Sequence, residues 1–196
     1  MPKGQVTKFE AARRQLVTAI RLFFEGGDSV SVYTLAHASW EVLDALCKHR
    51  GLTRFRDQMS GSTGLTEKEI KKIASYGRNF FKHADTDPDE LLKNFSDDLN
   101  DHVLIGATMD FGTLASTKPM EIQVFQLWYF AAHPEKAPRP DFDAIMEAAD
   151  LQFPGIASME RKNKKSAGLR VLMAAMRDPE LMDHPSTDPD IVRSMS

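Results

Sequence analysis

The sequence predicts an all-α protein: an antiparallel helical bundle with additional C-terminal helices. Apolar residues recur at helical spacing, capping residues with glycine or proline divide this pattern into segments, and no stretch keeps the alternation of a strand. With 196 residues the chain is long enough to bury a core without disulfides or metals. Its single cysteine, Cys47, lies in an apolar run and is expected to be a small buried thiol.

The first predicted helix covers residues 8–24. Thr7 and Glu10 have the spacing of a capping box, in which the hydroxyl accepts a hydrogen bond from a first-turn amide and the carboxylate reaches back. Gly26 and Gly27 end the helix, because glycine readily adopts the left-handed conformation that closes helices.

The second predicted helix is capped by Asp28 and ends at Gly51, with the basic residues 48–50 at its negative C-terminal dipole. Together with the first helix it predicts an antiparallel hairpin. Residues 52–64 mix Gly, Ser, Thr and charges without a period, so we expect an exposed loop there.

Three further helices are expected in the middle of the chain. The third covers residues 70–84 and breaks at residues 85–88, where aspartates precede a proline. A long fourth helix begins at Pro88 and continues to Leu114. The fifth opens at Pro119 and ends before Pro134.

The C-terminal part begins with a proline-rich connector, residues 134–140, followed by a short helix that Asp141 caps. Another helix is expected over residues 158–176, with its basic first turns, residues 161–165, forming a solvated face. The stretch from Asp178 is expected to be peripheral or mobile.

This order of elements predicts two parts. Residues 1–115 form the helical bundle, and residues 116–196 form an extension packed on it, with a mobile tail from about residue 178. The charge differs between the two: residues 1–84 carry 14 Lys and Arg against 8 Asp and Glu, whereas residues 85–196 carry 11 against 20. The N-terminal excess allows a basic face for phosphate groups.

The chain shows neither an export signal nor the run of about 18 apolar residues that a bilayer requires. We therefore expect a cytoplasmic protein that does not interact with a membrane. The lone cysteine agrees with a reducing compartment.

The candidate chemistry lies near the end of the third predicted helix, where Arg78, Asn79 and His83 combine a guanidinium, an amide and an imidazole. If they converge, they favour metal-free cleavage of an RNA phosphodiester, because the imidazole exchanges protons near neutral pH and the guanidinium binds the negative transition state. On an ideal helix Arg78 and His83 point about 140° apart, so convergence requires an unwound helix end or a partner subunit. The alternative is that both only neutralise the C-terminal helix dipole.

This layout resembles the HEPN superfamily of helical domains over roughly residues 7–115. The resemblance lies in the motif, an Arg followed by a polar residue with a His four to six positions after the Arg, matched by Arg78, Asn79 and His83, and in the two long antiparallel helices before it. It implies a bundle that dimerises so that the two motifs face one composite cleft. Active members are metal-independent ribonucleases, often toxins or defence proteins held in check by a partner, whereas others bind nucleotides or scaffold assemblies.

The resemblance also implies an acidic or polar residue beside the motif on an earlier helix, for which Glu41 and Asp44 are both candidates. We expect Lys82, Tyr76 and Glu41 to bind the substrate. The expected protein is a homodimer without cofactor or metal, whose partners are RNA or a nucleotide and a regulatory protein.

Two alternatives remain open. The first is a non-catalytic helical module that binds a protein or nucleotide partner. The second is a divalent metal site, in which His37 and Glu41 lie one turn apart on the second helix with Asp44 a further turn along, and His83 or Asp85 completes the ligand set.

Overall fold

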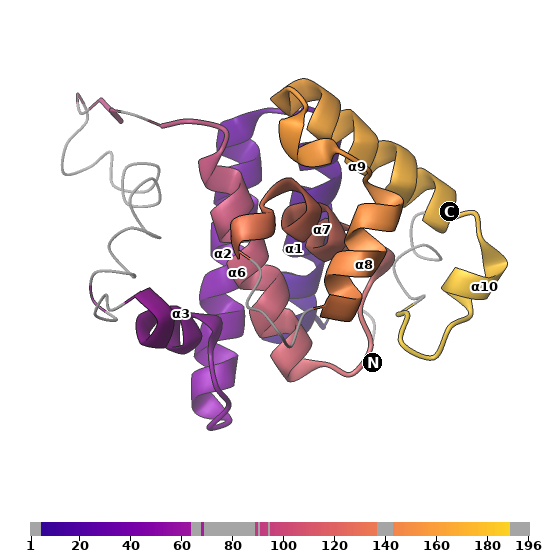
Figure 1. Ribbon diagram of the computed structural model, residues 1–196. Coiled ribbons are helices and arrows are strands. Elements are labelled where there is room, and N and C mark those ends of the chain that lie inside the picture. The colour runs from indigo at the N-terminus through magenta and orange to yellow at the C-terminus, as the bar shows by residue number, and fades with distance from the viewer. Residues whose placement is uncertain are drawn as a thin grey trace. The chain divides into compact units, whose positions relative to one another are not determined.

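A computed structural model describes residues 5–63, 68, 89, 91–93, 95–136 and 143–188 (Figure 1). In these ranges the regular elements are helices, and the β geometry is an isolated parallel bridge between Lys118 and Thr187. The predicted all-α class is therefore confirmed. Contacts divide the chain into two compact units: Met1–Ala19 with Asp28–Ala115, and Ile20–Gly27 with Ser116–Ser196.

The helix α1 (Lys8–Phe24) has the predicted bounds and contributes its residues up to Ala19 to the first unit. Thr7 Oγ1 accepts a hydrogen bond from the Glu10 amide at 3.1 Å, which is one half of the predicted capping box. The other half is wrong, because the Glu10 carboxylate accepts from Arg13 Nε and Arg14 Nε, each at 2.7 Å. Gly26, with φ of 72°, adopts the left-handed conformation after the helix.

The helix α2 (Ser29–His49) begins where Asp28 Oδ1 accepts a hydrogen bond from the Ser31 amide at 2.8 Å, as predicted. It packs on α1, where the hydroxyl of Ser39, midway along α2, donates to the carbonyl of Ala12 in the first half of α1 at 2.8 Å. Since Ala12 and Ser39 are similarly far from the turn that joins the helices, this contact supports the antiparallel hairpin.

The helix α6 (Leu99–Leu114) lies beside α2 (Figure 1). Gly106 allows the close approach, because a Cβ atom there would come within 2.6 Å of the Trp40 ring. Phe111 on α6 stacks on Phe9 with 5.1 Å between ring centroids.

The expected loop over residues 52–64 is wrong, because the helix α3 (Phe55–Thr63) occupies most of it. Arg54 holds the helix start: its amide donates to Asp57 Oδ2 at 3.1 Å. The Phe55 amide donates to Asp110 Oδ1 on α6 at 2.7 Å. This second partner is far away in the sequence, so local periodicity could not reveal it.

The fourth predicted helix also begins in the wrong place. Helix α6 starts at Leu99, and the described residues between 89 and 98 are turns or irregular. The buried Asn100 fixes the turn, since its Nδ2 donates to the Ser29 carbonyl at 3.2 Å and to Asp97 Oδ1 at 3.1 Å. The predicted end at Leu114 is confirmed. The third predicted helix and the break at residues 85–88 lie outside the described residues.

The second unit is built from the end of α1 and shorter helices. These are α7 (Met120–Ala132), η1 (Pro134–Lys136), α8 (Asp143–Gln152), η2 (Ile156–Ser158), α9 (Arg161–Ala175) and α10 (Pro179–Met182). Its core is an aromatic cluster of Phe23, Phe24, Phe125 and Trp128, whose ring centroids lie 5.1–6.0 Å apart. The α9 backbone packs directly on it, because a Cβ atom at Gly168 would come within 2.1 Å of the Phe24 ring.

The predicted solvated face at residues 161–165 needs correction. Lys165 is buried, with Nζ 4.4 Å from the centroid of the Phe23 ring, and the Arg161 guanidinium lies 5.3 Å from the same centroid. Lys162 and Asn163 are exposed, as expected. Helical spacing turns Lys165 towards the aromatic cluster one turn after Arg161, and its apolar stem allows the burial.

Residues from Asp178 onwards, expected to be peripheral or mobile, contain hydrogen-bonded structure as far as Asp188. Asp178 Oδ1 caps α10 by accepting from the Glu180 amide at 2.9 Å. The Lys118 amide donates to the Ser186 carbonyl at 2.9 Å, and the Asp188 amide donates to the Lys118 carbonyl at 3.0 Å. The predicted cap at Asp141 and residues 189–196 lie outside the described residues.

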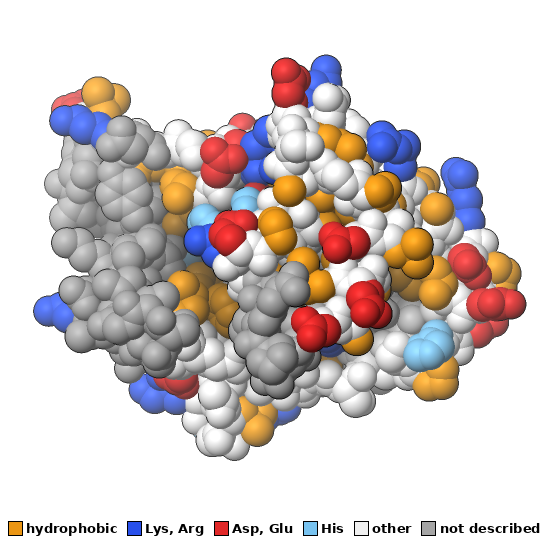
Figure 2. All heavy atoms as spheres, in the orientation of Figure 1, with side chains coloured by type: hydrophobic (Ala, Val, Ile, Leu, Met, Phe, Trp, Pro, Cys, Tyr) orange, Lys and Arg blue, Asp and Glu red, His pale blue; other side chains and the backbone are white. Residues whose placement is uncertain are grey.

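Acidic side chains gather over α8 (Figure 2), where Asp143, Glu147 and Asp150 are exposed. This agrees with the acidic balance of the C-terminal half. Among the described helices, none combines the length and the apolar character needed to cross a membrane.

Candidate functional site

The predicted catalytic residues Arg78, Asn79 and His83, and the predicted substrate-binding residues Lys82 and Tyr76, lie outside the described residues. The other site residues suggested by the sequence are on α2. These are Glu41, the third predicted substrate-binding residue, its alternative Asp44, and the neighbouring His37.

Glu41 lines an open groove between α1 and α2, with a volume of about 710 Å³. Its side chain is 34% exposed, so its carboxylate is accessible from solvent. The lining of the groove combines apolar and polar side chains. The lining residues are Lys8, Gln15, Ala38, Glu41, Val42, Ala45, Leu46 and His49.

His37 lies beside Glu41 but is buried at 5% exposure. Its Nδ1 is 3.9 Å from Glu41 Oε2, and its ring packs between those of Tyr33 and Trp40 at centroid distances of 5.8 and 6.5 Å. Within the described part of the chain, no cluster of three or more potential ligands could hold a metal ion. The other residues suggested for a metal site, His83 and Asp85, are outside that part.

Asp44 is engaged differently from Glu41. It is buried, and its Oδ1 is paired with Arg56 Nε at 2.6 Å, while Oδ2 lies 3.9 Å from an Arg54 terminal nitrogen. Both arginines come from the start of α3 or the residue before it. Asp44 therefore holds α3 against α2, which leaves Glu41 as the accessible acid of the two candidates.

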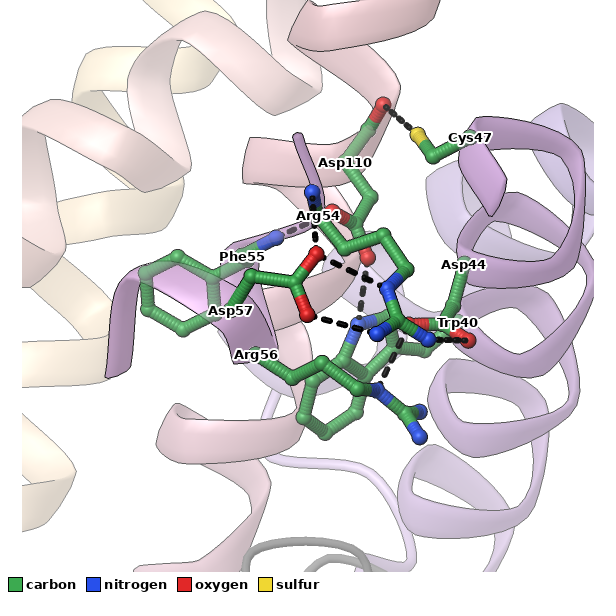
Figure 3. A network of polar contacts seen from close by, with 8 residues as sticks. All are labelled: Trp40, Asp44, Cys47, Arg54, Phe55, Arg56, Asp57 and Asp110. Atoms are coloured by element: carbon green, nitrogen blue, oxygen red, sulfur yellow. Dashed lines mark hydrogen bonds and ion pairs between the residues drawn. The ribbon is translucent and has the colours of Figure 1, made fainter. Parts of the chain in front are cut away.

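These ion pairs belong to a larger group of polar contacts, which we call the Asp110 network (Figure 3). It joins α2, α3 and α6 through Trp40, Asp44, Cys47, Arg54, Phe55, Arg56, Asp57 and Asp110. Sequence reasoning missed the network because its members are up to 70 residues apart. The available signal was Asp110 itself, the one charged residue in the second half of its helix.

Asp110 is fully buried at the centre of the network. Its Oδ2 accepts a hydrogen bond from Trp40 Nε1 at 2.8 Å, and its Oδ1 accepts from the Phe55 amide at 2.7 Å. Burial raises the pKa of Asp110 to about 6, because the two hydrogen bonds only partly offset the loss of hydration. The nearby Asp44 carboxylate also raises the pKa of Asp110.

Cys47 shares this environment, with its Sγ donating to the Asp110 carbonyl at 3.6 Å. Burial, and then the charges of Asp110 and Asp44, raise the pKa of the Cys47 thiol to about 11. The thiol is therefore protonated at neutral pH and is a poor nucleophile. This agrees with the small buried thiol expected from the sequence.

Comparison with known proteins found no matching family model, no matching curated protein and no matching solved structure.

Proposed function

We propose that the protein is a HEPN-like, metal-independent ribonuclease of a toxin or defence system, with Arg78, Asn79 and His83 as its catalytic residues. The observation that carries the proposal is the spacing of these three residues, Arg-Asn-x3-His, in a segment that follows two long helices. The antiparallel packing of α1 and α2 around the contact of Ser39 with Ala12 supports it.

In the proposed reaction, a neutral His83 imidazole takes the proton of an RNA 2′-hydroxyl, whose oxygen attacks the adjacent phosphorus. The bond to the 5′-oxygen breaks, and that oxygen is protonated by an imidazolium. Arg78 binds the non-bridging oxygens as negative charge builds up, and Asn79 orients the imidazole or donates to phosphate. The products are a 2′,3′-cyclic phosphate and a 5′-hydroxyl end. The reaction requires neither a metal ion nor a nucleophile from outside the RNA.

A homodimer makes this chemistry compatible with helix geometry. Two side chains five positions apart point about 140° away from each other on one helix, so a cleft shared by two copies lets Arg78 and His83 meet. Lys82, Tyr76 and Glu41 are proposed to bind RNA, with Glu41 preferred over Asp44 because Asp44 is buried and ion-paired with Arg56. A regulatory protein partner would hold the activity in check.

The test is RNA cleavage in excess EDTA by the purified protein and by the variants His83→Ala and Arg78→Ala. Loss of general acid–base catalysis should lower the rate of His83→Ala by about 10²–10⁴-fold. The control is His184→Ala, which removes an exposed histidine of the second unit and should cleave normally. Cleavage that needs a divalent metal, or that survives the loss of His83, would reject the proposal.

The second candidate is a non-catalytic module that binds a helical protein partner, and the groove between α1 and α2 favours it. Its apolar lining residues suit the apolar face of an amphipathic helix. They are Ala38, Val42, Ala45 and Leu46. A purified chain without nuclease activity that captures a saturable partner, and loses it in Ala45→Asp, would favour this candidate over the ribonuclease.

A further inference from the structure

The carboxyl group of Asp110 lies in the interior of the first unit, and each of its oxygens accepts a hydrogen bond from a neutral donor. These donors are the Trp40 indole and the Phe55 amide. The Arg56 guanidinium favours the ionised form of Asp110, but it is ion-paired with Asp44. When a fully buried carboxylate has only neutral hydrogen-bond donors, these donors offset only part of the free energy lost on its removal from water.

The charged and titratable groups around Asp110 come from α2 and from the start of α3 with the residue before it. They are Asp44 and Cys47 on α2, Arg54 before α3, and Arg56 and Asp57 on α3. Asp44 opposes ionisation of Asp110, Arg56 favours it, and burial outweighs both. The arginines are paired with Asp44 and Asp57.

The two hydrogen bonds of Asp110 hold different parts of the structure. Trp40 belongs to α2, whose long contact with α6 keeps the indole in place. Phe55 is the first residue of α3, a helix of only nine residues. If the start of α3 moved away, Oδ1 would lose its donor and become open to water.

The sign of the pH effect follows from how tightly the carboxyl holds a proton in each state. With α3 attached, burial raises the pKa of Asp110 to about 6, although the Phe55 amide and Arg56 each lower it. Detachment of α3 admits water to Oδ1 and brings the pKa down towards the ordinary value of 3.8, because the loss of burial outweighs the loss of these two contacts. Attachment therefore takes up a proton between about pH 4 and pH 6, and rising pH in that window favours the detached state.

We propose that Asp110 makes the attachment of α3 pH dependent: α3 is held tightly in mildly acidic solution and opens more often as the carboxyl ionises towards neutral pH. Helix α3 leads along the chain into the segment that carries Arg78 and His83. This inference concerns the movement of α3 and does not depend on RNA cleavage.

The experiment is hydrogen exchange of the intact protein, read by mass spectrometry in peptides covering α3, from pH 4.5 to 7.5. After correction for the intrinsic exchange rate, the opening constant of α3 should rise with pH, by up to about 100-fold across the full shift from 3.8 to about 6. Peptides from α9 serve as the internal reference and should show no such rise.

The matched variant is Asp110→Asn, which keeps one acceptor and cannot ionise. Although it loses one buried hydrogen bond, its α3 opening should be independent of pH. A second measurement uses the unmodified protein: the ¹³C shift of the Asp110 carboxyl should titrate near pH 6. Three results would overturn the proposal. The opening constant of α3 could be independent of pH, it could depend on pH equally in Asp110→Asn and the unmodified protein, or the Asp110 carboxyl could titrate near pH 4.

Discussion

Single residues stabilise this fold through two kinds of contact: with neighbours in the chain, as Thr7 does, and with partners that packing brings close, as Asp110 does. The caps at Thr7 and Asp28 were predicted correctly, because a capping side chain bonds to amides only three residues away. The pairing of Trp40 with Asp110 was missed, because the two residues meet only after α2 and α6 pack. Lys165 was missed for a related reason: the Phe23 ring that receives it belongs to a distant helix.

We predict that Lys165→Ala will lower the free energy of unfolding by about 1–2 kcal/mol. The substitution removes the ammonium group 4.4 Å from the Phe23 centroid and the apolar stem that covers the ring. Urea denaturation monitored by circular dichroism measures the effect. Lys162→Ala, three positions earlier and exposed, is the control and should stay within about 0.5 kcal/mol of the unsubstituted protein. Equal effects of the two substitutions would show that the contact with Phe23 contributes nothing.

At the scale of elements, helices with strong local signals were predicted well. The bounds of α1 match the prediction, and α2 and α7 agree with it apart from a residue or two at their ends. The helix α3 and the start of α6 were not predicted. Their ends depend on Asp110 and on the contact of Asn100 with Ser29, which are tertiary interactions without a local pattern.

The packing of α9 leads to a prediction about Gly168. Alanine in place of glycine inside a helix normally stabilises it by about 1 kcal/mol. At Gly168, however, a Cβ atom would come within 2.1 Å of the Phe24 ring, so the core must shift. We expect Gly168→Ala to destabilise the protein by about 1–3 kcal/mol, measured by thermal and urea denaturation. A rise in stability would mean that α9 does not approach Phe24 this closely.

At the scale of the whole molecule, the order of elements and the charge pattern are compatible with the functional proposal, which rests on the spacing of Arg78, Asn79 and His83. The excess of Lys and Arg in residues 1–84 and the position of the motif after α1 and α2 are both properties of the sequence. The structure adds the groove beside Glu41 and the Asp110 network, neither of which could be predicted, because each is formed by residues from more than one helix. It also shows that Glu41 is accessible from solvent whereas Asp44 is buried and ion-paired with Arg56.

The central claim is that Arg78 of one copy and His83 of another act in the same cleft. The most direct test mixes the two inactive variants, Arg78→Ala and His83→Ala, after joint unfolding and refolding, and measures RNA cleavage in EDTA. Our account predicts that the mixture regains activity that neither variant has alone, because the mixed dimer contains one intact guanidinium and one intact imidazole. A mixture that forms mixed dimers and still cannot cleave RNA would contradict it.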